Sequence, residues 1–468
     1  MGDFLLLFSD RPLCAREYIR RKPRVPESPD RRCDDQTECV PRRVAGYVKF
    51  KRAPVAPQHP GGPEHVGASA KVQSAHDVEP CRREGIVTVA LNQAAVLVGQ
   101  ERAASERPHE SIAPAGNLYI PSLDGIRAIS FFLVFFAHAG LGETLVPGGF
   151  GVSIFFLLSG FLITTLLRRE FARYRRISLS SFYLRRALRI LPPLYITLVL
   201  AMVLVHVGKG PATIPLVGTL TQALQVSNYY QIYANPAVIM PGSGVLWSLA
   251  VEEHFYLLFP LLYAWMCPRL PASRQALALL ALCGAALVWR CILVFHFHAG
   301  FLHTYYGTDA RFDSILFGCV LAVIANPVLG DPLHERLLRR MHWLLPLSVA
   351  VLLFTFLDRN EVFRETLRYS LQGLALIPLF IAAIRYQKSW PVRFLNLTFV
   401  RFLGVLSYTL YLCHHMFLET IQGSWNFNPL LTGSVALVCA FLFATAVHYW
   451  IERPCTRARK RLSRASAE

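Results

Sequence analysis

The chain has 468 residues, of which 53% are hydrophobic. Only 17% are charged, whereas charged residues make up roughly 25% of a typical soluble chain. This balance excludes an ordinary soluble protein. The net charge of +18 does not indicate nucleic-acid binding either, because the basic residues are spread over the short links between apolar stretches.

The first 112 residues differ in composition from the rest. They are rich in Arg, Pro, Glu and Asp, and they show neither a helical nor a strand period. A segment of this kind buries too little apolar surface to fold. We expect residues 1–112 to be a disordered extension, or sequence translated from upstream of the true start; a cytoplasmic regulatory tail is the alternative.

Apolar stretches of about 20 residues, the length that crosses a bilayer core, follow one another through the remaining chain. They predict an all-α, polytopic transmembrane bundle of about ten helices within residues 113–456, followed by a basic cytoplasmic tail, 457–468. The predicted spans are 128–142, 149–167, 190–208, 245–267, 275–296, 312–329, 342–357, 369–385, 399–421 and 429–451.

The links between the predicted spans differ in positive charge. Link 168–189 carries eight arginines, whereas links 141–148 and 422–428 carry no lysine or arginine. Cytoplasmic links of membrane proteins are enriched in basic residues. With link 168–189 inside, both termini are predicted to be cytoplasmic.

Eleven cysteines are present, mostly in apolar stretches, where small polarizable side chains pack well. None has CxxC spacing. We therefore predict no disulfide framework and no metal site.

The first span carries Arg127 and His138. Eleven residues correspond to three helical turns plus about 20°, so both side chains share one face, roughly 16 Å apart along the axis. We expect Arg127 at the cytoplasmic boundary and His138 deep in the bilayer. An anion held by Arg127 could then extend a thin chain towards His138. The alternative is a snorkelling arginine and a histidine bonded to a neighbouring helix.

Small residues mark the second span, in the sequence GFGVSIFFLLSGFLI at 149–163. Gly149, Gly151, Ser159 and Gly160 allow another helix to come close. We interpret them as packing residues.

A basic segment, RISLSSFYLRRALRILPPLY at 176–195, precedes the third span. Arg186 and Arg189 lie three residues apart and share one helix face. Because arginine forks match phosphate geometry, they indicate a phosphorylated ligand; anionic lipid headgroups are the alternative. Pro192 and Pro193 are expected to open the third span.

The fourth span contains Glu252, which shares a helix face with Ser248 and Tyr256. A carboxylate within a membrane segment is costly and indicates a functional site or a structural ion pair.

Asp309, Arg311 and Asp313 precede the sixth span on the predicted outer side. They could bind the hydroxyl groups of a sugar, or cap and brace the helix.

The ninth span places Ser407, Tyr411 and His414 at i, i+4 and i+7, which makes one polar helix face. A histidine near the middle of a membrane again needs a partner.

Taken together, these segments resemble the acyltransferase 3 family of membrane O-acyltransferases, over about residues 117–456. No single block is specific, but their joint order and spacing are. The blocks are Arg127-x10-His138, FFLLSGFLI at 155–163, FYLRRALRILPPLY at 182–195, WSLAVEEHFYLLFP at 247–260, TDARFDSILFG at 308–318 and LGVLSYTLYLCHH at 403–415.

The resemblance implies a bacterial plasma-membrane enzyme without a permanently bound cofactor. Its co-substrate would be an acyl-CoA, usually acetyl-CoA, approached from the cytoplasm, and its acceptor a carbohydrate or glycolipid such as a polysaccharide or lipopolysaccharide. The residues matched to the family, or expected from the polar faces above, fall into three groups. They are Arg127, Arg186 and Arg189 for the donor, His138 and Glu252 for catalysis, and Asp309, Arg311, Asp313, Tyr411 and His414 for the acceptor.

In this hypothesis His138 acts as a general base on an acceptor hydroxyl, with an acyl-histidine relay as the less favoured version. The rival class is a transporter or channel, since intramembrane His, Glu and Arg also mark transport pathways. No repeat between the two halves of the chain supports that class. A scaffold would leave His138 and Glu252 without a purpose.

Overall fold

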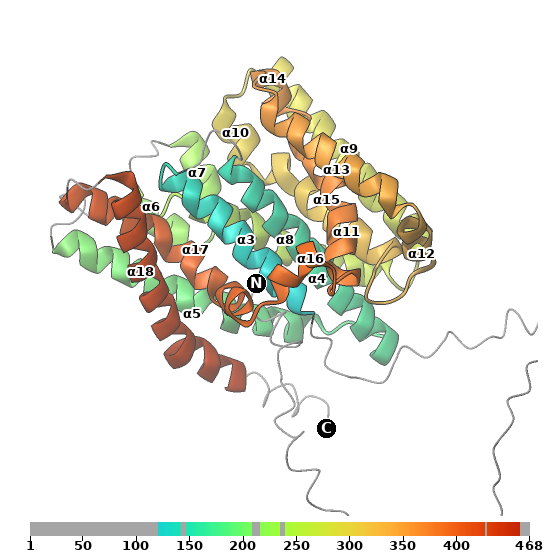
Figure 1. Ribbon diagram of the computed structural model, residues 1–468, viewed down its shortest axis with the longest axis horizontal. Helices are drawn as coiled ribbons and strands as arrows, with labels where there is room; N and C mark the ends of the chain where they lie inside the picture. Colours follow the sequence, from blue (N-terminus) through green and yellow to red (C-terminus); the bar gives the residue numbers. More distant parts are fainter. Residues whose placement is uncertain (1–119, 142–146, 208–215, 235–238, 426–427, 459–468) are drawn as a thin grey trace, which may run out of the picture. The chain divides into compact units, whose positions relative to one another are not determined.

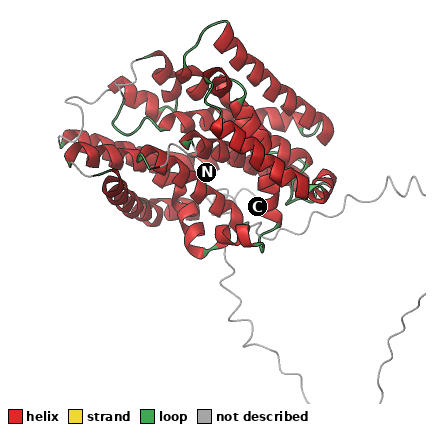
Figure 2. Cartoon of the chain, turned by 45° about the horizontal axis from the view of Figure 1, so that its top comes forward, coloured by secondary structure: helices red, strands yellow, loops and turns green. Residues whose placement is uncertain are grey.

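A computed structural model describes residues 120–458 apart from 142–146, 208–215, 235–238 and 426–427 (Figure 1). Every regular element in these residues is helical, and no strand occurs among them (Figure 2). The predicted all-α class is therefore confirmed. The predicted extension, residues 1–112, lies outside the described residues, as does most of the predicted basic tail.

The described chain consists of long helices joined by short ones. Each of the ten stretches predicted to span the membrane overlaps a long helix, although several, such as 312–329, run past its end. The long helices are α3 (Pro121–His138), α4 (Gly148–Tyr174), α5 (Leu179–His206), α8 (Leu246–Met266), α9 (Ala272–Phe295), α11 (Thr308–Ile324), α13 (Met341–Leu357), α15 (Arg368–Arg385), α17 (Thr398–Ser424) and α18 (Pro429–Val447). The short ones are α6 (Leu216–Ala223), α7 (Ser227–Tyr233), α10 (Phe301–Tyr306), α12 (Pro332–Arg339), α14 (Glu361–Glu365), α16 (Trp390–Arg393), η2 (Phe394–Asn396) and η3 (His448–Glu452).

Several helices are long and apolar enough to cross a membrane, so the chain is a multi-pass membrane protein. Among the described residues, four helices meet this criterion: α4, α5, α9 and the continuous run of α18 and η3. The number rises to six if the bent pairs α12–α13 and α15–η2 each count as one span. The predicted number of ten is not reached in this way. Four of the long helices fail the criterion in either count. The buried polar side chains described below lower the mean hydropathy of α3, α8 and α17, and α11 has only 17 residues.

Helices α4 and α11 pack with their backbones in direct contact. A Cβ atom at Gly160 would overlap the carbonyl oxygen of Ile315, and a Cβ at Gly318 would overlap that of Leu157. Small residues at membrane helix interfaces permit this approach. The packing role predicted for Gly160 is therefore confirmed.

A glycine also allows the backbones of α3 and α17 to come into direct contact. A Cβ atom at Gly404 would overlap the carbonyl group of Asp124. Gly404 lies one turn before Ser407 on α17, and Asp124 lies one turn before Arg127 on α3. The close approach of the two backbones thus brings the polar side chains of both helices together.

Helix α5 differs from the expectation. Pro192 and Pro193 do not stand at the start of a helix but lie inside one that begins at Leu179. Each proline lacks an N–H group and so leaves one preceding carbonyl without its helical donor. The carbonyls affected are those of Leu188 and Arg189, four residues before each proline. Next to them, Tyr408 on α17 donates a hydrogen bond of 2.8 Å to the carbonyl of Ile190, which ties α5 to α17 in this region.

The substitution Gly160→Ala tests the contact between α4 and α11. Because the new Cβ meets a backbone carbonyl that cannot rotate away, we expect a loss of about 1–3 kcal/mol of stability. The measurement is thermal unfolding of the detergent-solubilised protein. Gly284→Ala is the matched control, since no heavy atom lies within 4 Å of a Cβ there. Equal unfolding temperatures for the two variants would contradict this account of the packing.

Candidate active site

Arg127 and His138 both face α17, as their spacing predicts. Arg127 donates a hydrogen bond from Nε to the hydroxyl of Ser407, at 3.1 Å. Nδ1 of His138 lies 2.9 Å from Nε2 of His414. The two side chains therefore mark the two ends of one polar strip between α3 and α17.

Arg127 and His138 differ in their burial within the protein, whereas their predicted depths in the bilayer remain a prediction. Arg127 is fully buried, whereas His138 is the last residue of α3 and is exposed. The reason is that α3 begins at Pro121, seven residues before the predicted span. Arg127 is thereby drawn into the bundle, and the helix ends at His138.

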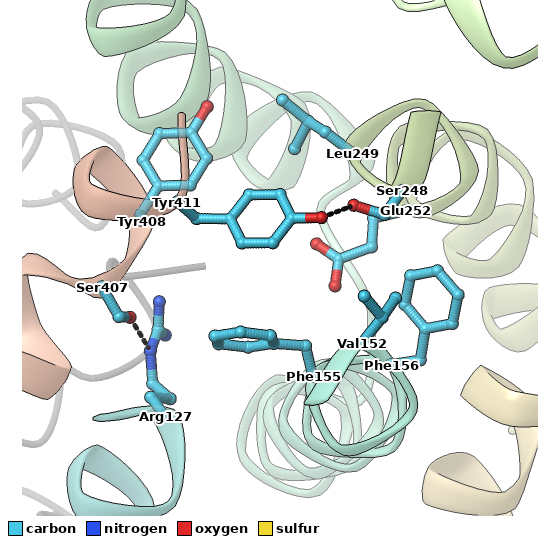
Figure 3. A pocket seen from close by; sticks show the side chains of 10 residues that line it. All are labelled: Arg127, Val152, Phe155, Phe156, Ser248, Leu249, Glu252, Ser407, Tyr408 and Tyr411. Carbon is cyan, nitrogen blue, oxygen red and sulfur yellow. Dashed lines mark hydrogen bonds between the residues drawn. The ribbon is translucent and has the colours of Figure 1, made fainter. Parts of the chain in front are cut away.

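A small cavity lies beside Arg127, between α3, α4, α8 and α17 (Figure 3). Its volume is about 30 Å³, more than the roughly 10–15 Å³ that one water molecule needs but far too small for a nucleotide. In Figure 3 the side chains of Arg127 and Glu252 point into this space from different helices, and the ring of Phe155 lies beside it. The lining residues are Arg127, Val152, Phe155, Phe156, Ser248, Leu249, Glu252, Ser407, Tyr408 and Tyr411.

Glu252 is buried and held by two hydroxyl groups. Ser159 on α4 donates to one carboxylate oxygen at 3.0 Å, and Tyr256 donates to the other at 3.1 Å. Ser248, one turn before Glu252, shares a hydrogen bond of 2.7 Å with Tyr411. The predicted polar stripe on α8 thus faces the bundle, and Ser159 has a polar role beyond packing.

Arg186 and Arg189 are also buried in this region. The guanidinium carbon of Arg186 lies 3.7 Å from the centre of the Tyr256 ring, which is a cation–π contact. Arg189 forms an ion pair of 3.3 Å with Glu452 and lies within electrostatic range of Arg127. Three arginines from α3 and α5 therefore converge near the carboxylate of Glu252. We call Arg127, Arg186 and Arg189 the arginine cluster.

Glu452 is a member of this region that the sequence did not single out. Besides Arg189, it accepts hydrogen bonds from Thr409 at 2.8 Å and from the His448 ring at 2.7 Å. A glutamate at the end of the last apolar stretch is costly in a membrane, and that signal could have revealed it.

Asp313 and Arg311 are fully buried and held by protein groups. Asp313 pairs with Arg290 through contacts of 2.7 and 2.8 Å and accepts a hydrogen bond of 2.6 Å from Ser370. The guanidinium carbon of Arg311 lies 3.8 Å from the centre of the Tyr369 ring. These contacts favour the bracing interpretation for both residues over the predicted contact with an acceptor.

Asp309, one turn before Asp313, is partly exposed and faces a different set of residues. Trp289 donates to its carboxylate at 2.6 Å, Tyr229 at 2.9 Å, and His303 lies at 3.0 Å. Burial, together with the neighbouring carboxylate, raises the pKa of Tyr229 to about 12, so its hydroxyl remains a donor at neutral pH. Asp309 therefore remains a candidate for acceptor binding. The aromatic residues around it come from other parts of the chain, and Tyr229 lies 80 residues earlier in the sequence.

Tyr411 and His414, which the sequence predicts to bind the acceptor, lie inside the helix bundle. Tyr411 lines the cavity, and His414 has no exposed surface. Together with Ser407 they form the predicted polar face of α17, and each bonds to a different residue of α3 or α8. Among the described residues, no group of three or more His, Cys, Asp or Glu side chains could hold a metal ion.

A family model for an acyltransferase domain matches residues 120–453. The chain belongs to the acyltransferase 3 family. The resemblance seen in the sequence blocks is thereby confirmed, and membership supports the prediction of an enzyme that transfers acyl groups.

Several curated relatives from Staphylococcus aureus are similar to this chain. O-acetyltransferase OatA of strain NCTC 8325 / PS 47 is 30% identical over 350 residues, which cover 72% of this chain and 57% of that protein. Putative O-acetyltransferases of strains COL and MSSA476 are each 28% identical, with the same shares covered. This chain thus spans a little over half the length of these relatives. No solved structure matches it.

Asp313→Asn tests the bracing role. The substitution leaves the guanidinium of Arg290 buried beside a neutral amide, and breaking a buried pair costs about 3–5 kcal/mol. We expect a large fall in the unfolding temperature of the solubilised protein, and a smaller one for Asp309→Asn, because that carboxylate is partly exposed. A stable Asp313→Asn protein that lost only its affinity for a sugar would instead favour the hydroxyl-binding interpretation.

Proposed function

We propose that this protein is a membrane-embedded O-acyltransferase that moves an acetyl group from acetyl-CoA to a hydroxyl of a carbohydrate or glycolipid acceptor. The observation that carries the proposal is the strip between α3 and α17, which joins a buried arginine cluster at Arg127 to an accessible imidazole at His138. Family membership and the names of the similar O-acetyltransferases support the reaction class.

The donor is proposed to bind through its phosphates at the arginine cluster. Guanidinium groups are planar, always charged and able to form two parallel hydrogen bonds to a phosphate. The cluster is buried and packed against Tyr256 and Glu452, and the adjoining cavity has a volume of only about 30 Å³. Binding therefore requires the surrounding helices or side chains to separate, with the thin pantetheine arm running along the polar face of α17.

His138 is proposed to act as the general base. Its imidazole takes the proton of the acceptor hydroxyl while the hydroxyl oxygen attacks the thioester carbonyl carbon. The carbon–sulfur bond then breaks, the new ester remains on the acceptor, and the CoA sulfur leaves and gains a proton. A neutral imidazole is suited to this transfer near pH 7.

Glu252 is proposed to help order the donor side of the site rather than to touch His138. Its carboxylate is bonded to Ser159 and Tyr256, and Tyr256 in turn carries Arg186 on its ring. The carboxylate thus fixes the ring on which one of the proposed phosphate-binding groups rests.

The orientation follows from the charge of the links. The link between α4 and α5 lies within the arginine-rich segment 168–189, which is proposed to face the cytoplasm, and we place both termini there. The protein would lie in a bacterial plasma membrane. Because α3 and α4 are antiparallel, with Ala137 beside Gly148, His138 lies at the end of the bundle opposite this basic link. The donor would therefore enter at one end of α3 and the acceptor approach the other.

His138→Ala tests the base. We expect acetyl transfer to fall by roughly 10²–10⁴-fold, the usual contribution of general acid–base catalysis, while the protein stays inserted and monodisperse. The measurement is release of CoA from labelled acetyl-CoA by protein in nanodiscs with extracted glycolipid as acceptor. Full activity of this variant would exclude His138 as the base, and carriage of intact acetyl-CoA into vesicles by the wild type would favour the transporter class.

Arg186→Gln tests the donor site. The wild type should use acetyl-CoA far better than acetyl-pantetheine, which lacks all the phosphates, and the variant should lose most of that preference through a higher KM for acetyl-CoA. A charge-assisted hydrogen bond contributes about 1.5–3 kcal/mol, so a rise of roughly 10–100-fold is expected. Arg185→Gln is the matched control, because Arg185 pairs at 3.4 Å with Glu170 outside the cluster. An unchanged preference in Arg186→Gln would contradict phosphate binding there.

A further inference from the structure

A chain of hydrogen bonds runs from the backbone of α17 to the accessible histidine of α3. Nδ1 of His414 lies 2.8 Å from the carbonyl oxygen of Tyr411. Nε2 of the same ring lies 2.9 Å from Nδ1 of His138, and the two imidazoles are stacked with centres 5.2 Å apart. The His414 ring thus lies between the backbone carbonyl of Tyr411 and His138, the proposed base.

The direction of the first bond is determined by chemistry. A carbonyl oxygen can only accept, so Nδ1 of His414 must carry a hydrogen and donate it. The state of the other nitrogen depends on whether His414 is charged. Its ring has no exposed surface and lies against the rings of Phe131 and Phe135, at 5.7 and 6.2 Å between centres.

Burial in such surroundings disfavours an imidazolium unless a carboxylate compensates it. The contacts of His414 within the described residues include no carboxylate, and Glu419 lies 3.2 Å from the adjacent His415 instead. We therefore take His414 as neutral. A neutral ring with hydrogen on Nδ1 has a lone pair on Nε2, and that nitrogen accepts the hydrogen bond.

The second bond is thereby directed as well: Nδ1 of His138 donates to Nε2 of His414. In neutral His138 the remaining nitrogen, Nε2, then carries the lone pair. His138 is exposed at the end of α3, so that nitrogen can meet an acceptor hydroxyl.

We propose that His414 is a positioning residue, which holds His138 in the tautomer and ring orientation that present Nε2 as the base. This inference rests on the proposed function, because it gives His414 a role in the same reaction. When His138 takes the acceptor's proton on Nε2, its Nδ1–H bond to His414 becomes charge-assisted and stronger. His414 gains no proton and exchanges none; it stabilises the cation that forms beside it.

The proposal makes a specific demand on residue 414, namely a hydrogen-bond acceptor at the place of Nε2. Glutamine meets this demand, because its amide oxygen reaches about as far as that nitrogen and accepts. Leucine occupies a similar space but accepts nothing. The pair His414→Gln and His414→Leu thus separates the hydrogen bond from the packing.

His415→Leu is the matched control. His415 is the next residue on α17, and its ring centre lies 4.6 Å from that of His138, but no hydrogen bond between these two rings is found in the described structure. If activity depended on having imidazole rings around His138, rather than on this hydrogen bond, His415→Leu would lose activity as well.

The experiment measures kcat, and KM for acetyl-CoA, for the wild type, His138→Ala and these three variants as purified protein in nanodiscs, with unfolding temperatures alongside. We expect His414→Leu to lower kcat by on the order of 100-fold or more, because a general base in the wrong tautomer loses most of its contribution. KM for the donor should stay within about threefold, because loss of transition-state interactions alone leaves it unchanged. His414→Gln should recover most of kcat, and His415→Leu should resemble the wild type.

Two results would overturn the positioning role. One is that His414→Leu retains the kcat of His414→Gln; the other is that both variants are equally inactive although folded. Failure of the proposed function looks different, since the wild type would then release no CoA, or His138→Ala would remain fully active.

Discussion

The burial of the Arg127 guanidinium is the constraint on which the rest of the site depends. Removing such a group from water is very costly unless polar partners surround it. Neighbouring helices supply two of them, since Ser407 accepts its hydrogen bond and Glu252 lies within electrostatic range. Asp124, one turn earlier on α3 itself, is also within electrostatic range. Glycines make this possible, because the contact at Gly404 lets α3 and α17 approach closely enough for short side chains to meet. A charged interior and tight packing are therefore two aspects of one arrangement.

The same strip explains how two chemical tasks can share one helix. Arg127 belongs to a cluster suited to phosphates, and His138, at the other end of α3, has an accessible ring. Between them the polar face of α17 presents Ser407, Tyr411 and His414 in succession. Each of these three makes its own hydrogen bond within the bundle. The strip therefore stays ordered, while one of its ends is proposed to bind the donor and the other to transfer a proton.

Much of this arrangement could be predicted from the sequence, because helical periodicity and the cost of intramembrane charge are local signals. They predicted a helix at every proposed span, the shared face of Arg127 and His138, and the polar face of α17. Helix ends were less predictable: α3 begins at Pro121, seven residues before the predicted span, and Pro192 and Pro193 lie inside α5 rather than at its start. Ion pairs between residues distant in sequence could not be predicted. No pattern near Asp313 indicates Arg290 as its partner, and none near Arg189 indicates Glu452. Such pairs depend on how helices are arranged, which local patterns do not encode.

The central claim is that the arginine cluster holds the phosphates of the acyl donor and directs its acyl end along α3. The most direct measurement is a cryo-electron microscopy structure of the protein in nanodiscs with a non-hydrolysable acetyl-CoA analogue. The account predicts phosphate oxygens within hydrogen-bond distance of Arg127, Arg186 or Arg189, with the cavity beside Arg127 opened and the pantetheine arm directed towards His138. Density for the analogue at another surface, with this cluster still closed on Tyr256 and Glu452, would contradict it.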